Sequence, residues 1–92
     1  MLTVIAYDIT DDRRRERVST LLEDYGLRVN YSVFECELEG EECTQVCAAL
    51  AQLIDAQADR ILVYRLCESC RPRKTTLGRP GEELGKSGVV IV

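Results

Sequence analysis

Residues 2–12 read Leu2-Thr-Val-Ile-Ala-Tyr-Asp-Ile-Thr-Asp-Asp12, and this stretch decides the fold that the sequence predicts. It begins as an almost continuous apolar run, which is typical of a central strand buried on both faces. The run stops at Asp8, so we expect this carboxylate at the carboxyl end of the strand, where it can meet solvent or a ligand. Thr10, Asp11 or Asp12 would cap the following helix, because a side-chain oxygen there accepts a hydrogen bond from a free N–H group.

Hydrophobic periodicity divides residues 1–67 into two helices and four strands. Apolar residues at helical spacing predict the helices, and Gly26 is placed to end the first of them in a left-handed cap. In the third strand, alternation would turn Glu35 and Glu37 away from Phe34, and the apolar run of the fourth strand indicates an interior position in the sheet. The predicted elements are helices over about residues 11–25 and 42–56 and strands over about residues 2–8, 28–31, 33–38 and 60–67.

This order, βαββαβ, is typical of an α+β ferredoxin-like domain with one sheet and both helices on one face. We expect a single domain over residues 1–92 with its core in residues 1–67, because a chain of this length buries only a thin core. Residues 68–87 carry several Gly and Pro and predict a loop-rich connection. Residues 88–92, Gly-Val-Val-Ile-Val, predict an extra C-terminal strand that would pair with the sheet edge of a second copy or of another protein.

The composition is that of an ordinary globular chain with a net charge of −4. No apolar run is long enough to span a bilayer and no export leader begins the chain, so we expect a cytoplasmic protein without membrane contact. Five cysteines, an odd number, predict reduced thiols that are buried or half-buried. Cys67-Glu-Ser-Cys70 is a lone CxxC motif in a chain without histidine, which favours neither a zinc site nor redox catalysis, and the role of these two cysteines stays open.

Basic residues cluster in two places although the chain is acidic overall. Arginines crowd the head of the first predicted helix, and further basic residues follow Asp59. Such segregation can give an acidic protein one basic face, although solvated charge and ion pairs to Asp8, Asp11 or Asp12 are the simpler alternatives. Arg14 lies on the apolar column of its helix, so we expect its guanidinium near Asp8. The candidate nucleic-acid-binding residues of the two clusters are Arg13, Arg14, Arg15, Arg17, Arg71, Arg73 and Lys74.

Two motifs are specific when they occur together. Residues 4–15 read Val-Ile-Ala-Tyr-Asp-Ile-x-Asp-Asp-x-Arg-Arg, and residues 25–36 read Tyr-Gly-x-Arg-Val-x-Tyr-Ser-Val-Phe-Glu-Cys. At this distance in a chain of this length, they closely resemble the small CRISPR-associated endonuclease family, the second core subunit of the spacer-acquisition machinery. The likeness extends over essentially the whole chain, including residues 64–67 and the hydrophobic C-terminal strand.

The resemblance implies a ferredoxin-fold homodimer in which the first-strand aspartate of each protomer approaches the two-fold axis. Some members cleave RNA or DNA with Mg²⁺, and in this antiviral system the dimer bridges two dimers of a larger integrase subunit along the new spacer DNA. By position, the catalytic and metal-binding aspartate carries over onto Asp8, and Arg28 joins the nucleic-acid-binding arginines. Supporting or dimer-site positions carry over onto Tyr7, Ser32 and Phe34.

Three functions follow as hypotheses. The first is a Mg²⁺-dependent endonuclease: Mg²⁺ keeps several waters, so two Asp8 residues meeting at a two-fold axis, with a substrate phosphate, would hold it and activate a water. The second is a non-catalytic adaptor that positions DNA and docks the integrase. The third is a ribonuclease toxin of the same fold. Base stacking by Tyr31 or Phe34 is conceivable, but a core or dimer-interface role is favoured. The expected docking residues of the adaptor are Val89, Val90, Ile91 and Val92.

Overall fold

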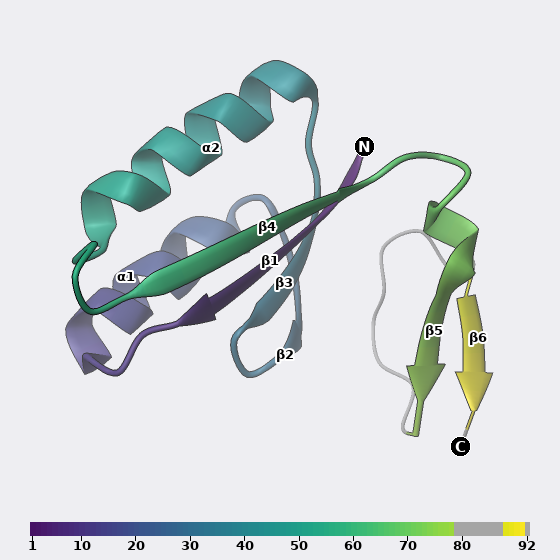
Figure 1. Ribbon diagram of the computed structural model, residues 1–92, viewed down its shortest axis with the longest axis horizontal. Coiled ribbons are helices and arrows are strands. Elements are labelled where there is room, and N and C mark those ends of the chain that lie inside the picture. Colours follow the sequence, from purple (N-terminus) through teal and green to yellow (C-terminus); the bar gives the residue numbers. More distant parts are fainter. Residues whose placement is uncertain (79–87, 92) are drawn as a thin grey trace.

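The computed structural model describes residues 1–78 and 88–91, so residues 79–87 and the last predicted docking residue, Val92, lie outside the described residues. The described residues form two α-helices, a four-stranded sheet and a separate two-stranded sheet, whose arrangement can be followed in Figure 1. No helix within the described ranges is both long and apolar enough to cross a bilayer. The elements are β1 (Leu2–Asp8), α1 (Asp12–Glu23), β2 (Gly26–Asn30), β3 (Val33–Glu37), α2 (Gly40–Leu53), β4 (Arg60–Leu66), the 3-10 turn η1 (Arg71–Arg73), β5 (Lys74–Leu77) and β6 (Gly88–Ile91).

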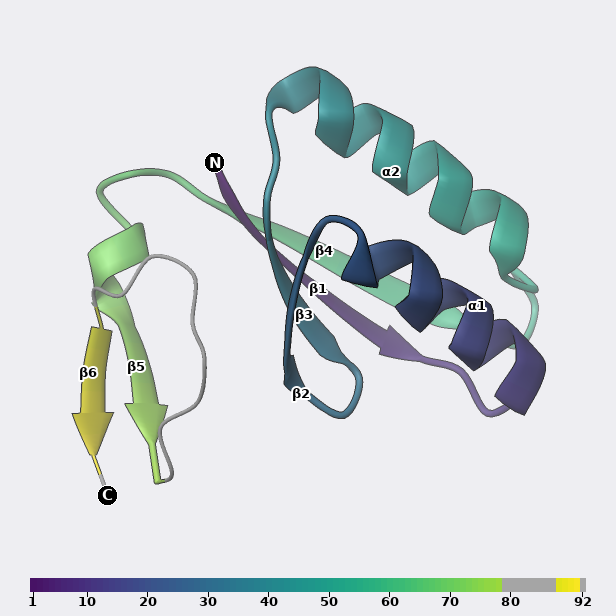
Figure 2. The same ribbon diagram turned by 180° about the vertical axis from the view of Figure 1, so that it is seen from behind.

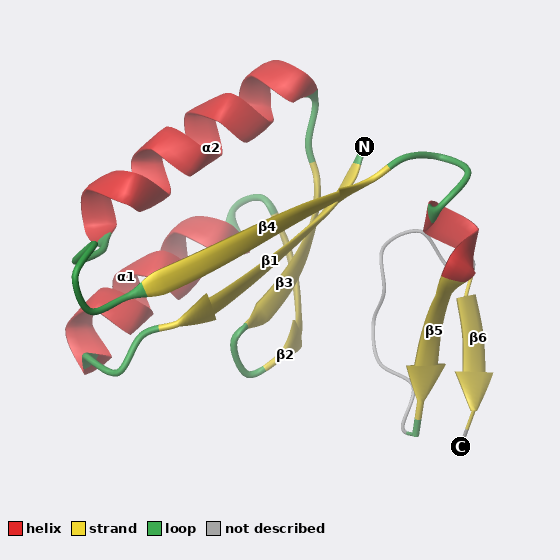
Figure 3. Ribbon diagram, viewed as in Figure 1, coloured by secondary structure: helices red, strands yellow, loops and turns green. Residues whose placement is uncertain are grey.

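β1 is the central strand of the main sheet, as its apolar run predicts. The strand order is β2-β3-β1-β4, and β1 runs antiparallel to both β3 and β4. Both helices cover the same face of this sheet (Figure 3). The predicted α+β ferredoxin-like fold is therefore confirmed, with additional short strands at the C-terminal end.

The hydrophobic core lies between the helices and one face of the sheet. Ile5 of β1 stands in register with Phe34 of β3 and Val63 of β4, so these three strands present apolar side chains to the helices at the same level. Val18 and Leu22 of α1 close over them, both fully buried. The other buried members of this core are Tyr7, Ile9, Cys36, Leu38, Cys43, Val46 and Leu50.

The position predicted for the fourth strand was wrong, because β4 lies at an edge of the four-stranded sheet. Its helix-facing Ile61 and Val63 are only partly buried against the core. On the opposite face Leu62 and Tyr64 are 37% and 57% exposed. The apolar run therefore reflects two apolar faces, one packed on the helices and one open, and not an interior place in the sheet.

α1 begins as predicted but ends differently. The Asp11 carboxylate caps it by accepting a hydrogen bond from the Arg14 backbone N–H at 2.9 Å. Gly26 does not form a left-handed cap; the helix closes at Asp24 in right-handed helical conformation, and Gly26 opens β2. A Cβ atom on Gly26 would lie 2.1 Å from the Glu35 carbonyl oxygen, so glycine is required by close strand pairing.

The segment after β4, expected to be loop-rich, contains η1 and β5 in its described part. β5 pairs in parallel with β6, so the C-terminal strand finds a partner within its own chain. Figures 1 and 2 place this strand pair on the opposite side of the sheet from the helices. Two ion pairs tie residues 71–77, which we call the C-terminal arm, to β3: Arg71 to Glu37 at 2.6 Å and Lys74 to Glu35 at 2.9 Å.

Replacing Gly26 by Ala should lower the free energy of unfolding by about 1–3 kcal/mol, since the new methyl group meets backbone atoms that cannot rotate away. Urea denaturation followed by circular dichroism measures this change. Gly40→Ala is the matched control, because nothing lies within 4 Å of its added Cβ and alanine favours the helix that begins there. Equal stability of the Gly26→Ala variant and the wild type would contradict the close approach.

Candidate functional site

Asp8 lies at the end of β1 on the sheet face opposite the helices, which we call the open face. It stands in register with Arg60, the first residue of β4, and both side chains are exposed. A hollow of about 260 Å³ is lined by Ala6, Tyr7, Asp8, Arg60 and Leu62. Within residues 1–78 and 88–91, no hydrogen bond or ion pair engages the Asp8 carboxylate. An acid in this position is free to bind a cation.

A single chain does not offer a complete metal cage at Asp8. The described residues contain no group of three or more acidic or cysteine side chains able to hold an ion. Mg²⁺, however, is usually held by one or two carboxylates, with waters and substrate phosphates completing the shell. The donor set at Asp8 fits Mg²⁺ only where a second carboxylate or a phosphate joins it.

Tyr7 and Phe34 lie behind Asp8, on the helix side of the sheet. Phe34 is fully buried, with its ring 6.4 Å from that of Tyr7, so the structure places it in the core and away from the open face. The Tyr7 N–H donates to the Ser32 carbonyl at 3.0 Å, which ties the end of β1 to the turn before β3. Burial raises the pKa of Tyr7, whose hydroxyl has no described partner. Tyr31, by contrast, is 67% exposed.

Arg15 and Arg28 frame a second hollow, of about 250 Å³, on the helix side of Tyr7. Arg15 donates to the carbonyls of Ile9 at 3.0 Å and Thr10 at 3.2 Å and pairs with Asp12. Arg28 donates to the Tyr31 carbonyl at 2.7 Å, and its guanidinium carbon lies 5.1 Å from the centre of the Phe34 ring. These contacts order the Arg15 guanidinium at the loop that follows Asp8 and the Arg28 guanidinium at the turn between β2 and β3. The hollow is lined by Tyr7, Asp12, Arg15, Glu16, Ser19, Arg28 and Tyr31.

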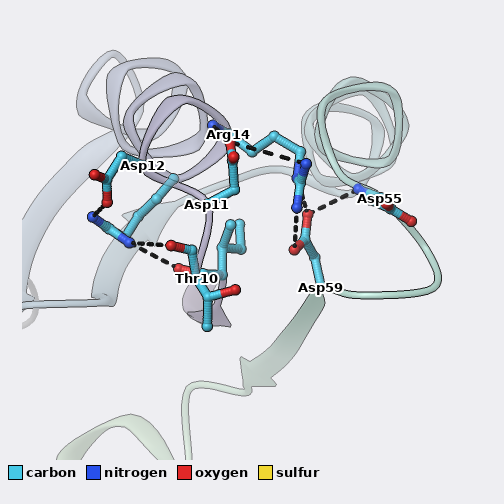
Figure 4. Close-up of polar contacts among 8 residues, drawn as sticks. Thr10, Asp11, Asp12, Arg14, Asp55 and Asp59 are labelled. Atoms are coloured by element: carbon cyan, nitrogen blue, oxygen red, sulfur yellow. Dashed lines mark hydrogen bonds and ion pairs between the residues drawn. The ribbon is translucent and has the colours of Figure 1, made fainter.

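The prediction that Arg14 reaches toward Asp8 was wrong. Its guanidinium crosses from α1 to Asp59, just before β4, with Nε–Oδ2 at 2.7 Å and Nη2–Oδ1 at 3.3 Å (Figure 4). The Asp59 side chain is fully buried and also accepts the Asp55 N–H at 2.8 Å. The hydrogen bond from Arg14 holds the pKa of Asp59 below its ordinary value. Arg14 thus neutralises an acid of its own chain and links α1 to β4.

The remaining predicted phosphate-binding residues fall into two groups. Arg71 and Lys74 are tied to acids of β3. Arg13, Arg17 and Arg73 are exposed, and within the described part of the chain no ion pair engages them. Arg13 and Arg17 border a wide groove of about 570 Å³ along α1. These exposed arginines are the charges best placed to meet a phosphate backbone.

Two participants were not foreseen from the sequence. Arg60 lies beside Asp8 on the neighbouring strand. Asp59 forms an ion pair with Arg14, the arginine that was expected near Asp8. Arg60 had a signal in the sequence, because it opens the fourth predicted strand, and antiparallel pairing sets the start of that strand beside the end of the first. Asp59 had none, since its partner lies 45 residues away on a helix whose rotation depends on packing.

Fold and site together define a small ferredoxin-like α+β domain with an exposed acid at the end of its central strand and an arginine-rich first helix. Residues 1–74 match the family described as "CRISPR associated protein Cas2", and the chain belongs to this family, as its motifs predict. It is 47% identical over 79 residues to "CRISPR-associated endoribonuclease Cas2 1" of Chloroflexus aurantiacus, covering 85% of each chain.

Solved structures agree with this assignment. The structure of Streptococcus pyogenes Cas2 at pH 6.5 matches with a TM-score of 0.76 and 35% identity, over 85% of this chain and 100% of that one. A chain of the "Partial Cas6-RT-Cas1--Cas2 complex" matches with a TM-score of 0.57 and 29% identity, over 67% of this chain and 76% of that one.

The Arg14–Asp59 pair should make stability depend on acid pH. The folded protein holds the pKa of Asp59 below its ordinary value, so the contribution is present above about pH 4 and is lost as pH falls through the lowered pKa. In Arg14→Gln the free energy of unfolding should therefore fall less steeply between pH 5 and pH 2 than in the wild type. Urea midpoints across this range measure it.

Asp24→Asn is the control for this pH series, because it removes an exposed acid and leaves the Arg14–Asp59 pair intact. Its acid profile should follow the wild type. Parallel profiles for Arg14→Gln and the wild type would mean that the pair does not lower the pKa of Asp59.

Proposed function

We propose that this chain is a nucleic-acid-binding subunit of a CRISPR spacer-acquisition complex and acts as a homodimeric, Mg²⁺-dependent endonuclease. The observation that carries the proposal is Asp8, an exposed and unengaged carboxylate at the end of the central strand in the described structure. The name of the relative from Chloroflexus aurantiacus, an endoribonuclease, supports phosphodiester cleavage as its chemistry.

Homodimerisation is supported by the apolar character of the open face. Leu62 and Tyr64 are exposed there, beside the partly exposed Val4 and Ala6 of β1. A two-fold contact uses the same surface on both copies and so brings equivalent residues together near the axis. A dimer formed through this face with its two-fold axis beside Asp8 would place two Asp8 carboxylates in one site, and so would supply the second ligand that one chain lacks.

The chemistry that a bound Mg²⁺ supplies is a water of lowered pKa and positive charge beside the phosphate. The chain itself would contribute the paired Asp8 carboxylates as ligands, while Arg60 offers a guanidinium to the phosphate from the next strand. Tyr7 and its bond to the Ser32 carbonyl hold the end of β1 in place. The absence of histidine leaves no imidazole base in this chain, which is why metal-activated water is the proposed nucleophile.

Nucleic-acid binding is supported by the arginines that no described acid neutralises. Arg13 and Arg17 on α1 and Arg73 on the C-terminal arm present charge to solvent. Neutralising phosphates releases counterions and supplies most of such binding, even for a protein of net negative charge. Arg15 and Arg28 add ordered guanidinium groups at the hollow on the helix side of Tyr7.

An adaptor without catalysis is the second candidate, favoured by the likeness to a chain of a Cas1–Cas2 complex. In this role the protein would position spacer DNA and dock the integrase. The proposed docking residues Val89, Val90 and Ile91 lie on β6, which closes the short C-terminal sheet. Membership of the family favours both candidates over a ribonuclease toxin of the same fold.

Asp8→Asn should abolish Mg²⁺-dependent cleavage of RNA or DNA while leaving the fold and the dimer intact, because the amide keeps the shape and loses the charge. Cleavage of labelled oligonucleotides with Mg²⁺ and with EDTA, beside light scattering for the oligomer, measures both. Glu41→Gln, an exposed acid on α2, is the control and should cleave like the wild type.

The same variant separates the two candidates. Cleavage by Asp8→Asn at the wild-type rate would refute the assignment of Asp8. A wild-type protein that binds nucleic acid and integrase but cleaves nothing with Mg²⁺ would leave the adaptor as the function.

The double variant Arg13→Ala/Arg17→Ala should bind nucleic acid more weakly and with a flatter salt dependence. Each lost phosphate contact on B-DNA lowers the slope of log K against log salt by about 0.9, so the slope should fall by about 2. Fluorescence anisotropy between low and physiological salt measures it. Arg14→Gln is the matched control, since Asp59 already neutralises Arg14. If the salt slope of Arg14→Gln fell as much as that of the double variant, the claim that only the exposed arginines contact phosphate would be contradicted.

A further inference from the structure

Cys67 and Cys70 lie in one tight turn that leads out of β4. The backbone N–H groups of Cys70 and Arg71 both donate to the Cys67 carbonyl, at 3.0 and 2.9 Å. In such a turn the first and fourth Cα atoms lie less than about 7 Å apart, which is the range that a disulfide spans. Both side chains are exposed, which corrects the expectation of buried thiols at these positions, and both are free thiols.

The two thiols differ in reactivity. The Cys67 sulfur lies 3.1 Å from the Ser69 hydroxyl oxygen. Hydrogen bonds from Ser69 and then from Cys70 lower the pKa of Cys67 to about 7. The same contact raises the pKa of Cys70, because it favours the protonated partner. Cys67 is thus the attacking thiolate at neutral pH, with a second thiol in contact with it.

The other three cysteines lack this chemistry. Cys36 and Cys43 are buried, and burial raises the pKa of Cys36 to about 11. Cys47 is half-buried, and burial raises its pKa also. Reactivity is therefore confined by the fold to the turn after β4.

We propose that Cys67 and Cys70 form a reversible dithiol–disulfide site that reacts with small-molecule disulfides of the glutathione class. The Cys67 thiolate attacks one sulfur of the small disulfide, forms a mixed disulfide and expels one small thiolate. The Cys70 thiolate then attacks the Cys67 sulfur and expels the second. Two protein thiols lose two electrons and two protons to become a disulfide, while the small disulfide is reduced to two thiols.

The position of this site gives its oxidation a consequence. Arg71 follows Cys70 directly and holds Glu37, and Lys74 holds Glu35, so the turn is the joint by which the C-terminal arm is attached to the sheet. A disulfide across so short a segment adds little to global stability, because the closed loop is small. It fixes the turn locally, and so restrains the strands β5 and β6 that follow.

The test begins with the reduced full chain in glutathione buffers of increasing oxidised fraction, quenched with iodoacetamide and mapped by peptide mass spectrometry. We expect one intrachain bond between Cys67 and Cys70, reversed by dithiothreitol, with Cys36, Cys43 and Cys47 alkylated after unfolding. In the reduced protein at pH 7, Cys67 should react with iodoacetamide roughly threefold faster than an ordinary thiol. A larger thiolate fraction, about half against about three in a hundred, outweighs its lower intrinsic nucleophilicity.

Single variants separate the two roles. Cys70→Ser should accumulate glutathione on Cys67 as an unresolved mixed disulfide, whereas Cys67→Ser should react slowly. Ser69→Ala should shift the pH profile of Cys67 alkylation upward while leaving the fold unchanged.

Hydrogen exchange of the amides of residues 71–77 reports on the joint. It should slow in the oxidised wild type relative to the reduced protein, and should not slow on oxidation of Cys70→Ser, which cannot close the disulfide. Bonds only between chains, no bond at full oxidation, or equal exchange in both redox states would overturn the proposal.

Discussion

Every other part of the domain depends on the pairing of β1 along both of its edges. β3 and β4 each run antiparallel to it, and the helices cover the face that carries Ile5 and Tyr7. Because successive side chains of a strand point to opposite faces, this arrangement buries Tyr7 and leaves Asp8 on the open face. The acid is held on rigid backbone although its own carboxylate is unengaged within the described structure. A site on a central strand is positioned more accurately than one on a loop.

Charged side chains have two roles in this small protein: some form ion pairs that stabilise the fold, and others are exposed to solvent. Glu35 is 4% exposed and is compensated by Lys74, while the buried Asp59 carboxylate is compensated by Arg14. An uncompensated charge at either place would be costly, because burial removes its hydration. Neither cation is then free to bind phosphate, which leaves Arg13 and Arg17 exposed on α1 as candidates. The basic cluster at the head of α1 therefore contains both an arginine that forms an internal ion pair, Arg14, and arginines that are exposed, Arg13 and Arg17.

Burial also divides the cysteines into two groups, those in the core and those in the exposed turn that leads to the C-terminal arm. Buried thiols such as Cys36 are held protonated by the apolar core. The turn after β4 brings Cys67 and Cys70 together in solvent, beside the ion pair of Arg71 with Glu37. The dithiol site proposed for this motif therefore rests on its place in the turn between the sheet and the C-terminal arm. Burial in the core raises the pKa of a thiol, whereas hydrogen bonds in the exposed turn lower the pKa of Cys67.

The sequence by itself determined the order of the elements from β1 to β4, the central place of β1, a capping side chain among residues 10–12 and the exposure of Asp8, because these follow from local periodicity and capping. Only the tertiary structure decided which acid each arginine meets, that β4 lies at an edge, and that β6 pairs with β5. The spacing of apolar residues indicates which side chains are buried, but not which helix or strand packs against them. Ion pairs and strand partners join residues far apart in the chain, and they are set by how the helices and strands pack in three dimensions.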